Sequence, residues 1–301
     1  MNIRILVVGA SGMLGYSLFR ELAATGKHEV HGTVRAISGS QRAYFPVKNG
    51  SIHEGVDVHD FTSLEHVVES FSPNVVINCV GVIKQLSASK VPIESVSINS
   101  LLPHKLAETC TRNQAKLIHF STDCVFSGAI GAYKESDLPD ATDLYGRSKL
   151  LGEVDYGGHL TLRTSIIGHE LTTSHSLIDW FLAQKVKTRG FRKAIFSGLP
   201  TVEIARILDE YVLNNSSLTG LLHLSAQPIN KYDLLCLIRD VYGNQIEIEP
   251  SDELLIDRSL LSQKFRQITQ YMPPSWPELV RQMHAAYTAY YKDSSVVGKK
   301  L

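Results

Sequence analysis

The feature that most constrains the fold is a glycine-rich turn close to the amino end of the chain. The apolar run 3–8 leads into Gly9-Ala10-Ser11-Gly12-Met13-Leu14-Gly15, and an amphipathic stretch follows. A strand that ends in such a turn and opens a helix is the setting in which backbone N–H groups bind the phosphates of a dinucleotide. There Gly9 allows the tight turn, Gly12 lets the backbone approach a pyrophosphate, and Gly15 lets the helix pack close to the sheet. A plain strand-turn-helix is the alternative. The predicted cofactor contacts in this turn are Gly9, Ser11, Gly12, Met13, Leu14 and Gly15.

Short apolar runs alternate with amphipathic stretches through the first half of the chain, which predicts βαβ units and a parallel sheet. Right-handed crossovers then give a doubly wound, Rossmann-type α/β sheet. We expect a dinucleotide-binding domain over 1–165 and a smaller C-terminal substrate lobe over 166–301. The boundary is soft, because elements from about 195–225 should join the first sheet. The expected strands are 3–8, 30–34, 51–58, 75–79, 116–121 and 160–164, with helices at 13–25, 62–71, 97–112 and 142–155. In the second half we expect helices at 176–187, 203–214, 231–242 and 277–291 and short strands at 221–225 and 245–248.

The end of the second predicted strand indicates which dinucleotide binds. NAD-binding proteins usually carry an acid there for the ribose hydroxyls, but this chain has Thr33, Val34 and Arg35. An arginine in this place can stack on the adenine and pair with a 2′-phosphate, so the sequence favours NADPH, with NADH as the alternative. An exposed surface arginine would give the same pattern. Asp57 and its neighbour Val58, at the end of the third strand, are further predicted cofactor contacts, with an ordinary strand-end aspartate as the alternative.

A second motif, Tyr145-Gly146-Arg147-Ser148-Lys149, falls in the predicted helix 142–155. Positions four apart share a helix face, so Tyr145 and Lys149 are neighbours. A free tyrosine has a pKa of about 10, and an ammonium beside it favours the phenolate, which suits the pair to proton transfer at a carbinol oxygen. Thr122, at the carboxyl end of the fifth strand, lies where open α/β sheets build their sites, and its hydroxyl can orient a substrate oxygen. The alternatives are a solvated surface pair and a loop-initiating Ser/Thr/Asp cluster.

Together these motifs resemble the extended branch of the short-chain dehydrogenase/reductase superfamily, and within it the dTDP-4-dehydrorhamnose reductases. The segments that carry the resemblance are GASGMLG, STDCVFSG and YGRSK. Shorter matching pieces at 78–81, 98–99, 163–165, 198–201, 222–225 and 274–276 extend it over nearly the whole chain.

The resemblance implies an NAD(P)-bound Rossmann fold and hydride transfer to the 4-keto carbon of a sugar nucleotide held by the C-terminal lobe. It implies that Tyr145 is the proton donor, that Lys149 binds the nicotinamide ribose and tunes Tyr145, and that Thr122 holds the substrate oxygen. The remaining expected cofactor contacts are Val80, Gly81, Asn99 and Ile166, and the expected substrate contacts are Lys84, Asp123, Val125 and Phe126.

Two departures from the family pattern bear on the substrate. Rhamnose enzymes commonly carry a tyrosine after Ser-Thr-Asp, where this chain has Cys124. Sugar-nucleotide 4,6-dehydratases carry Asp-Glu after the threonine, and that glutamate is absent here, so simple reduction is favoured over dehydration. A UDP-linked N-acetylated 4-keto-6-deoxyhexose is an alternative to the dTDP sugar. At Cys124 we expect a buried, inert thiol.

A basic block over 185–193 offers a second set of substrate contacts. It holds five cations and no acid. A nucleotide sugar carries a diphosphate that arginine or lysine can clamp, so Arg189 and Arg192 are predicted substrate contacts, with a solvated face as the alternative. We expect the acids that restore neutrality to lie at the surface; they are Glu247, Glu249, Asp252, Glu253 and Asp257.

The composition excludes several classes of function. The 301 residues carry 30 Lys plus Arg and 30 Asp plus Glu, so the zero net charge gives no case for nucleic acid or an anionic membrane as partner. Four widely spaced cysteines without a CxxC pair, and scattered histidines, predict neither a metal site nor a disulfide framework. The first apolar run is too short for a signal peptide, and no segment approaches the roughly 20 apolar residues that span a bilayer. We therefore expect a cytoplasmic protein.

These observations favour a cytoplasmic, NADPH-dependent reductase of a nucleotide-linked 4-keto-6-deoxy sugar, of the kind used for cell-surface polysaccharide precursors. A sugar-nucleotide 4-epimerase, which retains its cofactor through oxidation and re-reduction, is one alternative. A non-catalytic NADP-binding regulatory subunit is another, because the regulatory subunit of methionine adenosyltransferase resembles the same reductases. The expected partners are the nucleotide-sugar substrate and, in a homodimer, a second copy of the chain.

Overall fold

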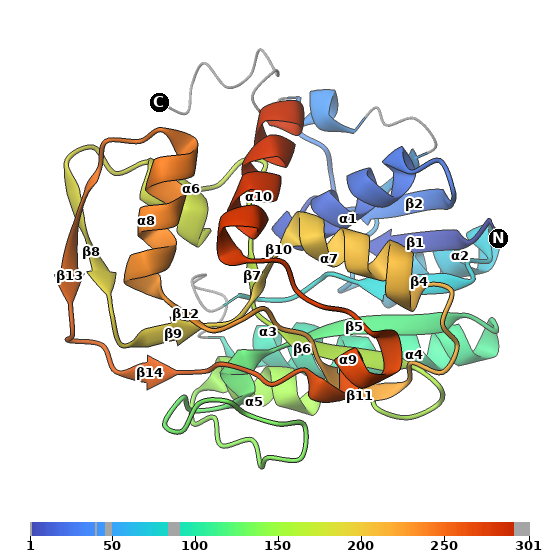
Figure 1. Ribbon diagram of the computed structural model, residues 1–301. Helices are drawn as coiled ribbons and strands as arrows, with labels where there is room; N and C mark the ends of the chain where they lie inside the picture. Colours follow the sequence, from blue (N-terminus) through green and yellow to red (C-terminus); the bar gives the residue numbers. More distant parts are fainter. Residues whose placement is uncertain (1, 40, 46–49, 84–90, 292–301) are drawn as a thin grey trace.

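The structure is a computed structural model that describes residues 2–39, 41–45, 50–83 and 91–291. Its centre is a seven-stranded sheet in the order β11-β6-β5-β4-β1-β2-β3, in which every neighbouring pair runs parallel. The order reverses between β1 and β4, and doubly wound sheets bind their ligands at such a reversal. The strands, shown in Figure 1, are β1 (Arg4–Val8), β2 (Glu29–Val34), β3 (Gly50–Glu54), β4 (Val75–Asn78), β5 (Lys116–Thr122), β6 (Leu160–Thr164) and β11 (Gly220–His223).

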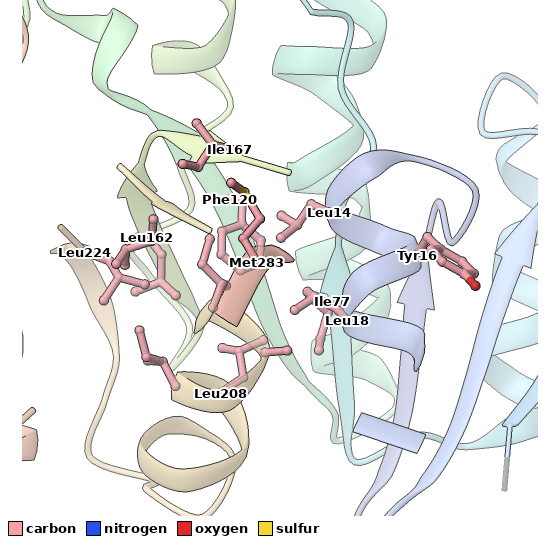
Figure 2. Close-up of a cluster of buried hydrophobic side chains, with 14 of the residues drawn as sticks. Leu14, Tyr16, Leu18, Ile77, Phe120, Leu162, Ile167, Leu208, Leu224 and Met283 are labelled. Atoms are coloured by element: carbon pink, nitrogen blue, oxygen red, sulfur yellow. The ribbon is translucent and has the colours of Figure 1, made fainter. Parts of the chain in front are cut away.

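Helices cover both faces of the sheet because its strands are apolar on both sides. In β1, Ile5 and Val7 point into one core, whereas Leu6 and Val8 point into the other, as the two-residue period of a strand requires. Figure 2 shows Leu14 of the first helix and Met283 of the last among the side chains of the first core. That core is covered by α1 (Met13–Ala24), α7 (Thr201–Ile207) and α10 (Trp276–Tyr290), and the second by α2 (Phe61–Phe71) and α4 (Leu102–Arg112).

The predicted doubly wound α/β fold is confirmed, and the strand at 160–164 has the expected bounds. The third strand ends at Glu54, earlier than the expected 58, because Gly55 takes a φ of +81° and turns the chain away from the sheet. The strand at the far edge, β11, comes from the second half of the chain and pairs with β6. The division into domains at 165 and 166 stays a prediction.

The expected helix 97–112 is interrupted by a π-helical turn. This turn, Val96–Leu101, lies between α3 (Pro92–Ser95) and α4. A π turn inserts an extra residue and redirects the side chains around it, often beside a functional site. Here it places Asn99 in the interior, where the residue is 1% exposed.

The second lobe departs most from expectation. The expected helix 176–187 is wrong beyond its first half, because α6 (Leu177–Leu182) ends early and Lys187 begins the strand β8 (Lys187–Phe191). This strand pairs in parallel with β13 (Glu247–Ser251), and so distant a partner leaves no local signal. Figure 1 shows α10 between the main sheet and the outer elements β8 and β13. Further elements are α5 (Leu144–Leu151), α8 (Lys231–Tyr242), α9 (Gln263–Thr269), β7 (Ile166–Ile167), β9 (Ala194–Phe196), β10 (Leu199–Pro200), β12 (Ile229–Asn230) and β14 (Ile256–Asp257). The structure also has 3-10 turns at Arg42–Tyr44 and Asp123–Val125 and a second π-helical turn at Leu208–Val212.

Candidate active site

The glycine turn has the geometry of a phosphate cradle. Gly9 takes a φ of +85°, which residues with a side chain rarely adopt, and a Cβ at Gly15 would lie 2.1 Å from the Gly9 carbonyl oxygen. A Cβ at Gly12 would meet only that oxygen, at 3.6 Å, which is an ordinary contact. The packing of the protein itself therefore requires the first and third glycines but not the middle one. The space left beside Gly12 is where the predicted phosphate would approach.

The first turn of α1 adds donors to this cradle. Gly12 is the N-cap, it has an extended backbone, and no side chain caps the helix. The turn also holds no acidic residue. Free N–H groups and the positive end of the helix dipole favour an anion at this point. Ser11 and Met13 are partly exposed here, whereas Leu14 is buried in the core and can offer only its backbone N–H.

The neighbouring strand ends surround the turn. The Val80 side chain reaches it, since a Cβ on Gly9 would lie 2.7 Å from Val80 Cγ2. Gly81 follows directly, and Ile166 begins β7 just after β6 as a half-buried residue. These placements put the expected nicotinamide contacts at the carboxyl ends of the strands, and their role in binding stays a prediction.

Arg35 directly follows β2 and is exposed, and no hydrogen bond or ion pair joins its guanidinium to the described residues. Arg42, in contrast, pairs with Glu54. Asp57 accepts a hydrogen bond from the His59 N–H at 3.0 Å, and Val58 packs on the second core. A free arginine at this place suits a 2′-phosphate, which also stays a prediction.

The structure brings Thr122, Tyr145 and Lys149 together. Tyr145 and Lys149 lie one turn apart on α5 (Leu144–Leu151), and Thr122 is the last residue of β5. The helix packs tightly on the strand end, because a Cβ on Gly146 would lie 2.3 Å from the Cys124 carbonyl oxygen. The Thr122 and Tyr145 side chains interact there, and Lys149 Nζ donates to the Phe120 carbonyl of the same strand. All three residues thus lie near the carboxyl end of β5, on the edge of the sheet where the glycine turn also lies.

Burial controls the protonation of this group. It raises the pKa of Tyr145, and the interaction with the Thr122 side chain only partly opposes the shift. Desolvation lowers the pKa of Lys149 to about 8, against the charge of Glu153. Lys149 Nζ donates to the Phe120 carbonyl at 2.6 Å, and burial dominates the pKa of Tyr145, so the tuning of the tyrosine by the lysine stays a prediction. Tyr145 therefore keeps its proton at neutral pH and can act as an acid.

Asn99 joins the catalytic helix to the loop after β4. Its Oδ1 accepts from the Val82 N–H at 2.9 Å, and its Nδ2 donates to the Val82 carbonyl and to Ser148 Oγ, both at 3.1 Å. All of these contacts lie in the interior. The structure thus gives the side chain of this expected cofactor residue a positioning role, since it fixes α5 against the cofactor loop.

A buried ion pair follows the catalytic helix, and the sequence reasoning missed its acid. Glu153 binds Arg163 through two parallel contacts of 2.7 Å, with both side chains less than one-tenth exposed. Ser121 Oγ donates to the same carboxylate at 2.6 Å. The sequence did hold one signal for this acid, since Glu153 follows Lys149 by four residues, the spacing of side chains on one helix face. The network ties the end of α5 to β5 and β6.

The expected substrate contacts beside Thr122 are mostly interior. Asp123 is 8% exposed and accepts a hydrogen bond from the Thr122 hydroxyl at 3.1 Å. Val125 and Phe126 are completely buried in a small core with Tyr133, so their side chains do not face a solvent-filled site. Lys84 lies outside the described residues.

Four of the five cations in the basic block 185–193 pair with acids, and within the described residues Lys185 has no such pair. Arg189 pairs with Glu253 at 2.7 Å, and Arg192 makes two contacts of 2.8 and 2.9 Å with Asp252. All four side chains are exposed. The basic and acidic blocks thus neutralise each other across β8 and β13. A guanidinium that already holds a carboxylate is a poor phosphate clamp, so the geometry does not favour the substrate role predicted for these arginines.

Two other cations, which the sequence reasoning missed, do reach the site. Arg258 follows β14 and donates through Nε to the Phe126 carbonyl at 2.8 Å. Lys231 is the first residue of α8. Both lie close enough to Asp123 to lower its pKa against the effect of burial, which raises it. Neither belongs to a basic run, so no local pattern marked them.

Within the described ranges, no group of three or more His, Cys, Asp or Glu side chains is placed to hold a metal. Among the helices of the same ranges, none has the length and apolar character needed to cross a membrane.

Known proteins share this sequence pattern over most of the chain. The family described as RmlD substrate binding domain matches residues 3–288. The beta subunit of methionine adenosyltransferase 2 from Bos taurus is 26% identical over 263 residues, which covers 80% of this chain and 73% of that protein. A dTDP-4-dehydrorhamnose reductase from Aggregatibacter actinomycetemcomitans is 32% identical over 151 residues, which covers 50% of this chain and 45% of that protein.

A solved structure shows the same fold. The dTDP-4-dehydrorhamnose reductase from Bacillus anthracis in complex with NADP matches with a TM-score of 0.77 at 18% identity, covering 95% of this chain and 99% of that one. The resemblance found in the sequence motifs is therefore confirmed at the level of the family. Since the match runs over residues 3–288, the chain belongs to the RmlD substrate binding domain family of the short-chain dehydrogenase/reductase type.

Proposed function

We propose that the protein catalyses the NADPH-dependent reduction of the 4-keto group of a nucleotide-linked 6-deoxyhexose, either a dTDP-4-dehydrorhamnose-like or a UDP-N-acetyl sugar. The observation that carries this proposal is the meeting of Thr122, Tyr145 and Lys149 at the carboxyl end of β5, beside a glycine turn with room for a pyrophosphate. Membership of the family and the reductase among the relatives support it. The product would serve the synthesis of cell-surface polysaccharide precursors.

In this mechanism Tyr145 is the acid. Its raised pKa keeps the phenolic proton in place until a carbonyl oxygen arrives. When bound, a reduced nicotinamide supplies the hydride that adds to the carbonyl carbon. Tyr145 gives its proton to the carbonyl oxygen, so the ketone becomes a secondary alcohol and a phenolate remains. Thr122, whose side chain lowers the pKa of Tyr145 against burial, stabilises that phenolate until solvent returns the proton. The role proposed for the ammonium of Lys149, one turn away on α5, is to add a positive charge beside it.

Two features support NADPH as the cofactor. Arg35 is exposed and free of acidic partners among the described residues, and β2 ends without the acid that binds a ribose diol. The cofactor phosphates would lie on the first turn of α1 over Gly12. Lys149 would hold the nicotinamide ribose.

Replacing Tyr145 by phenylalanine tests the catalytic role. The change removes one hydroxyl, and general acid catalysis is worth about 10²- to 10⁴-fold, so turnover should fall by that factor while NADPH affinity stays within about twofold. Tyr156→Phe is the matched control, since that exposed tyrosine bonds to His104 instead. Turnover is followed by the loss of NADPH absorbance on dTDP- and UDP-linked 4-keto sugars, with NADH compared. Unchanged turnover in Tyr145→Phe would refute the mechanism.

A regulatory subunit is the second candidate function, because the methionine adenosyltransferase subunit matches 80% of the chain. In that case the protein would bind NADP without turning over any keto sugar in the screen, and it would form a stable complex with a synthetase in size-exclusion chromatography. The intact Thr122, Tyr145 and Lys149 set favours the enzyme.

The same absorbance assay separates a reductase from a 4-epimerase. A reductase consumes NADPH in proportion to the product formed. An epimerase re-reduces its own intermediate, so an isomer of the substrate would accumulate without net loss of NADPH. Stoichiometric consumption is the result expected here.

We also infer a homodimer. Apolar side chains stand exposed together along α3, the π-helical turn and α5: Ile93 is 77% exposed and Leu151 65%. These elements pack against one another, so the residues form one face. Sedimentation should show a dimer that Ile93→Glu dissociates. A monomeric wild-type protein would refute this assignment.

A further inference from the structure

A short segment joins the expected cofactor site to the outer helices of the fold. It runs from Ile166, the expected nicotinamide contact that begins β7, to His169, and we call residues 166–169 the nicotinamide segment. Its strand β7 pairs in parallel with β10. A Cβ on Gly168 would lie 3.4 Å from Cγ of Met13, the first residue of α1, so the middle of the segment lies close to the glycine turn.

His169 anchors the end of this segment. The residue is 4% exposed, and both of its ring nitrogens have a partner. Nδ1 lies 2.6 Å from Asp179 Oδ1, and Nε2 lies 2.8 Å from the hydroxyl oxygen of Tyr242. Asp179 belongs to α6, and Tyr242 is the last residue of α8, which packs against β8 and β13. One imidazole thus ties the nicotinamide segment to two helices that lie outside the main sheet.

The chemistry of the two partners gives these hydrogen bonds a direction. Asp179 Oδ2 accepts from the Glu170 N–H at 2.7 Å and from the Ser176 hydroxyl at 3.1 Å, as a carboxylate does, so Oδ1 accepts the proton on Nδ1 of His169. Burial raises the pKa of Tyr242, so its hydroxyl keeps the proton and donates to Nε2. Each ring nitrogen therefore has the partner that a neutral imidazole protonated on Nδ1 requires.

Packing does not hold the anchor on every side. Gly168 and His169 border a pocket between α1 and α10, which Tyr16 and Arg20 line from α1. From α10 the ring of Tyr287 contacts the imidazole, with 4.2 Å between the ring centroids, but its hydroxyl makes no hydrogen bond with the described residues. The end of the nicotinamide segment is therefore held in place mainly by its two hydrogen bonds to α6 and α8.

We propose that His169 is a positioning residue that couples the nicotinamide segment to α6 and α8. This inference rests on the proposed function, in which the nicotinamide lies beside Ile166 and the C-terminal lobe holds the sugar nucleotide. Hydride transfer needs the two reacting carbons at close range, and a misplacement of about 1 Å can cost about 10²-fold in rate. His169 serves this geometry because it fixes the cofactor side of the site to helices of the lobe that holds the substrate.

Deleting a single hydroxyl tests the coupling. Tyr242→Phe removes the donor to Nε2 and keeps the ring, so kcat for keto-sugar reduction should fall by about 10- to 100-fold, while the dissociation constant of NADPH stays within about twofold. Tyr287→Phe is the matched control, because its ring contacts the same imidazole without a hydrogen bond from its hydroxyl to the described residues, and its kcat should not change. His169→Asn keeps an amide N–H near the place of Nδ1 and should recover part of the loss in His169→Ala.

A second readout does not depend on turnover. The fluorescence of bound NADPH depends on the surroundings of its nicotinamide, so the emission of the bound cofactor should change in Tyr242→Phe and stay unchanged in Tyr287→Phe. A hydroxyl with a merely structural role would lower the Tm of Tyr242→Phe but leave kcat and this emission as they are in the wild-type protein.

The outcomes separate this inference from the proposed function. Altered emission in Tyr242→Phe supports the coupling even if no keto sugar is reduced. Unchanged kcat and emission in Tyr242→Phe would leave the reductase intact and overturn the coupling, and equal losses in Tyr242→Phe and Tyr287→Phe would overturn it as well. Failure of the wild-type protein to bind NADPH would also overturn it. Both phenylalanine variants keep the aromatic ring in place, so the decision does not depend on the folding of His169→Ala.

Discussion

Replacing Gly12 with alanine should separate cofactor binding from folding. The backbone at this position has a φ of −79° and a ψ of 166°, which alanine adopts without strain. The new Cβ would touch only the Gly9 carbonyl oxygen, at 3.6 Å. Alanine is a poorer N-cap than glycine, which costs about 0.5–1 kcal/mol of stability. For a chain of this size that corresponds to a fall in Tm of only about 1–4 °C.

The effect on NADP should be much larger. The same Cβ would occupy the space where a phosphate oxygen must approach the helix amino terminus, so at least one charge-assisted hydrogen bond is lost. Such bonds contribute about 1.5–3 kcal/mol, which predicts a dissociation constant about 10- to 100-fold higher. Calorimetric titration with NADP measures this change, and a thermal melt of the same sample measures the stability.

Gly15→Ala is the contrasting variant. Its Cβ would lie 2.1 Å from the Gly9 carbonyl oxygen and 3.1 Å from Ala10 Cα, so the strand and the helix must separate. Overpacking of this kind costs about 1–3 kcal/mol or more, and Tm should fall further than in Gly12→Ala. Full NADP affinity in Gly12→Ala would refute the phosphate cradle. Equal loss of stability in the two variants would refute the division of roles between the glycines.

Three further predictions follow from the charges. Reduction should slow as the pH rises through about 8, because Lys149 loses the proton whose charge stabilises the phenolate; a pH–rate profile that is flat to pH 10 would contradict this. Glu153→Leu leaves the Arg163 guanidinium buried without its partner and should cost about 3–5 kcal/mol in urea unfolding, whereas a loss below about 1 kcal/mol would show that the pair is dispensable. Arg35→Ala should raise KM for NADPH by about tenfold and leave KM for NADH unchanged; an equal change in both would exclude the 2′-phosphate contact.

The parts of this fold that the sequence predicts are those specified by neighbouring residues. The strand at 160–164 and the helix at 231–242 have the expected bounds, because each has a clear apolar period and turn residues at its ends. The glycine turn was predictable for the same reason, since strand, turn and helix are contiguous. The Tyr145 and Lys149 pair needed only the four-residue period of a helix.

The segments that the sequence does not predict are those whose structure depends on residues far away along the chain. Lys187 begins a strand because Glu247 offers a backbone edge, and no pattern near Lys187 shows this. The π-helical turn at Asn99 is favoured by buried bonds to Val82 and Ser148, which lie 17 and 49 residues away. Local propensity predicts an ordinary helix for both segments, but packing against distant parts of the chain determines their actual conformation.

The sequence also does not predict which charged side chains pair after folding, and this pairing decides where an anion can bind. A run of cations such as 185–193 is visible in the sequence, but whether it attracts a ligand depends on which cations lack a carboxylate after folding. Arg189 is neutralised by an acid 64 residues away, whereas Arg258 faces a thiol and a carbonyl. An isolated arginine can therefore be a stronger anion site than a basic cluster, because binding energy depends on the charge that folding leaves uncompensated. In this chain Arg258 and Lys231 keep their charges close to Asp123, the residue next to Thr122.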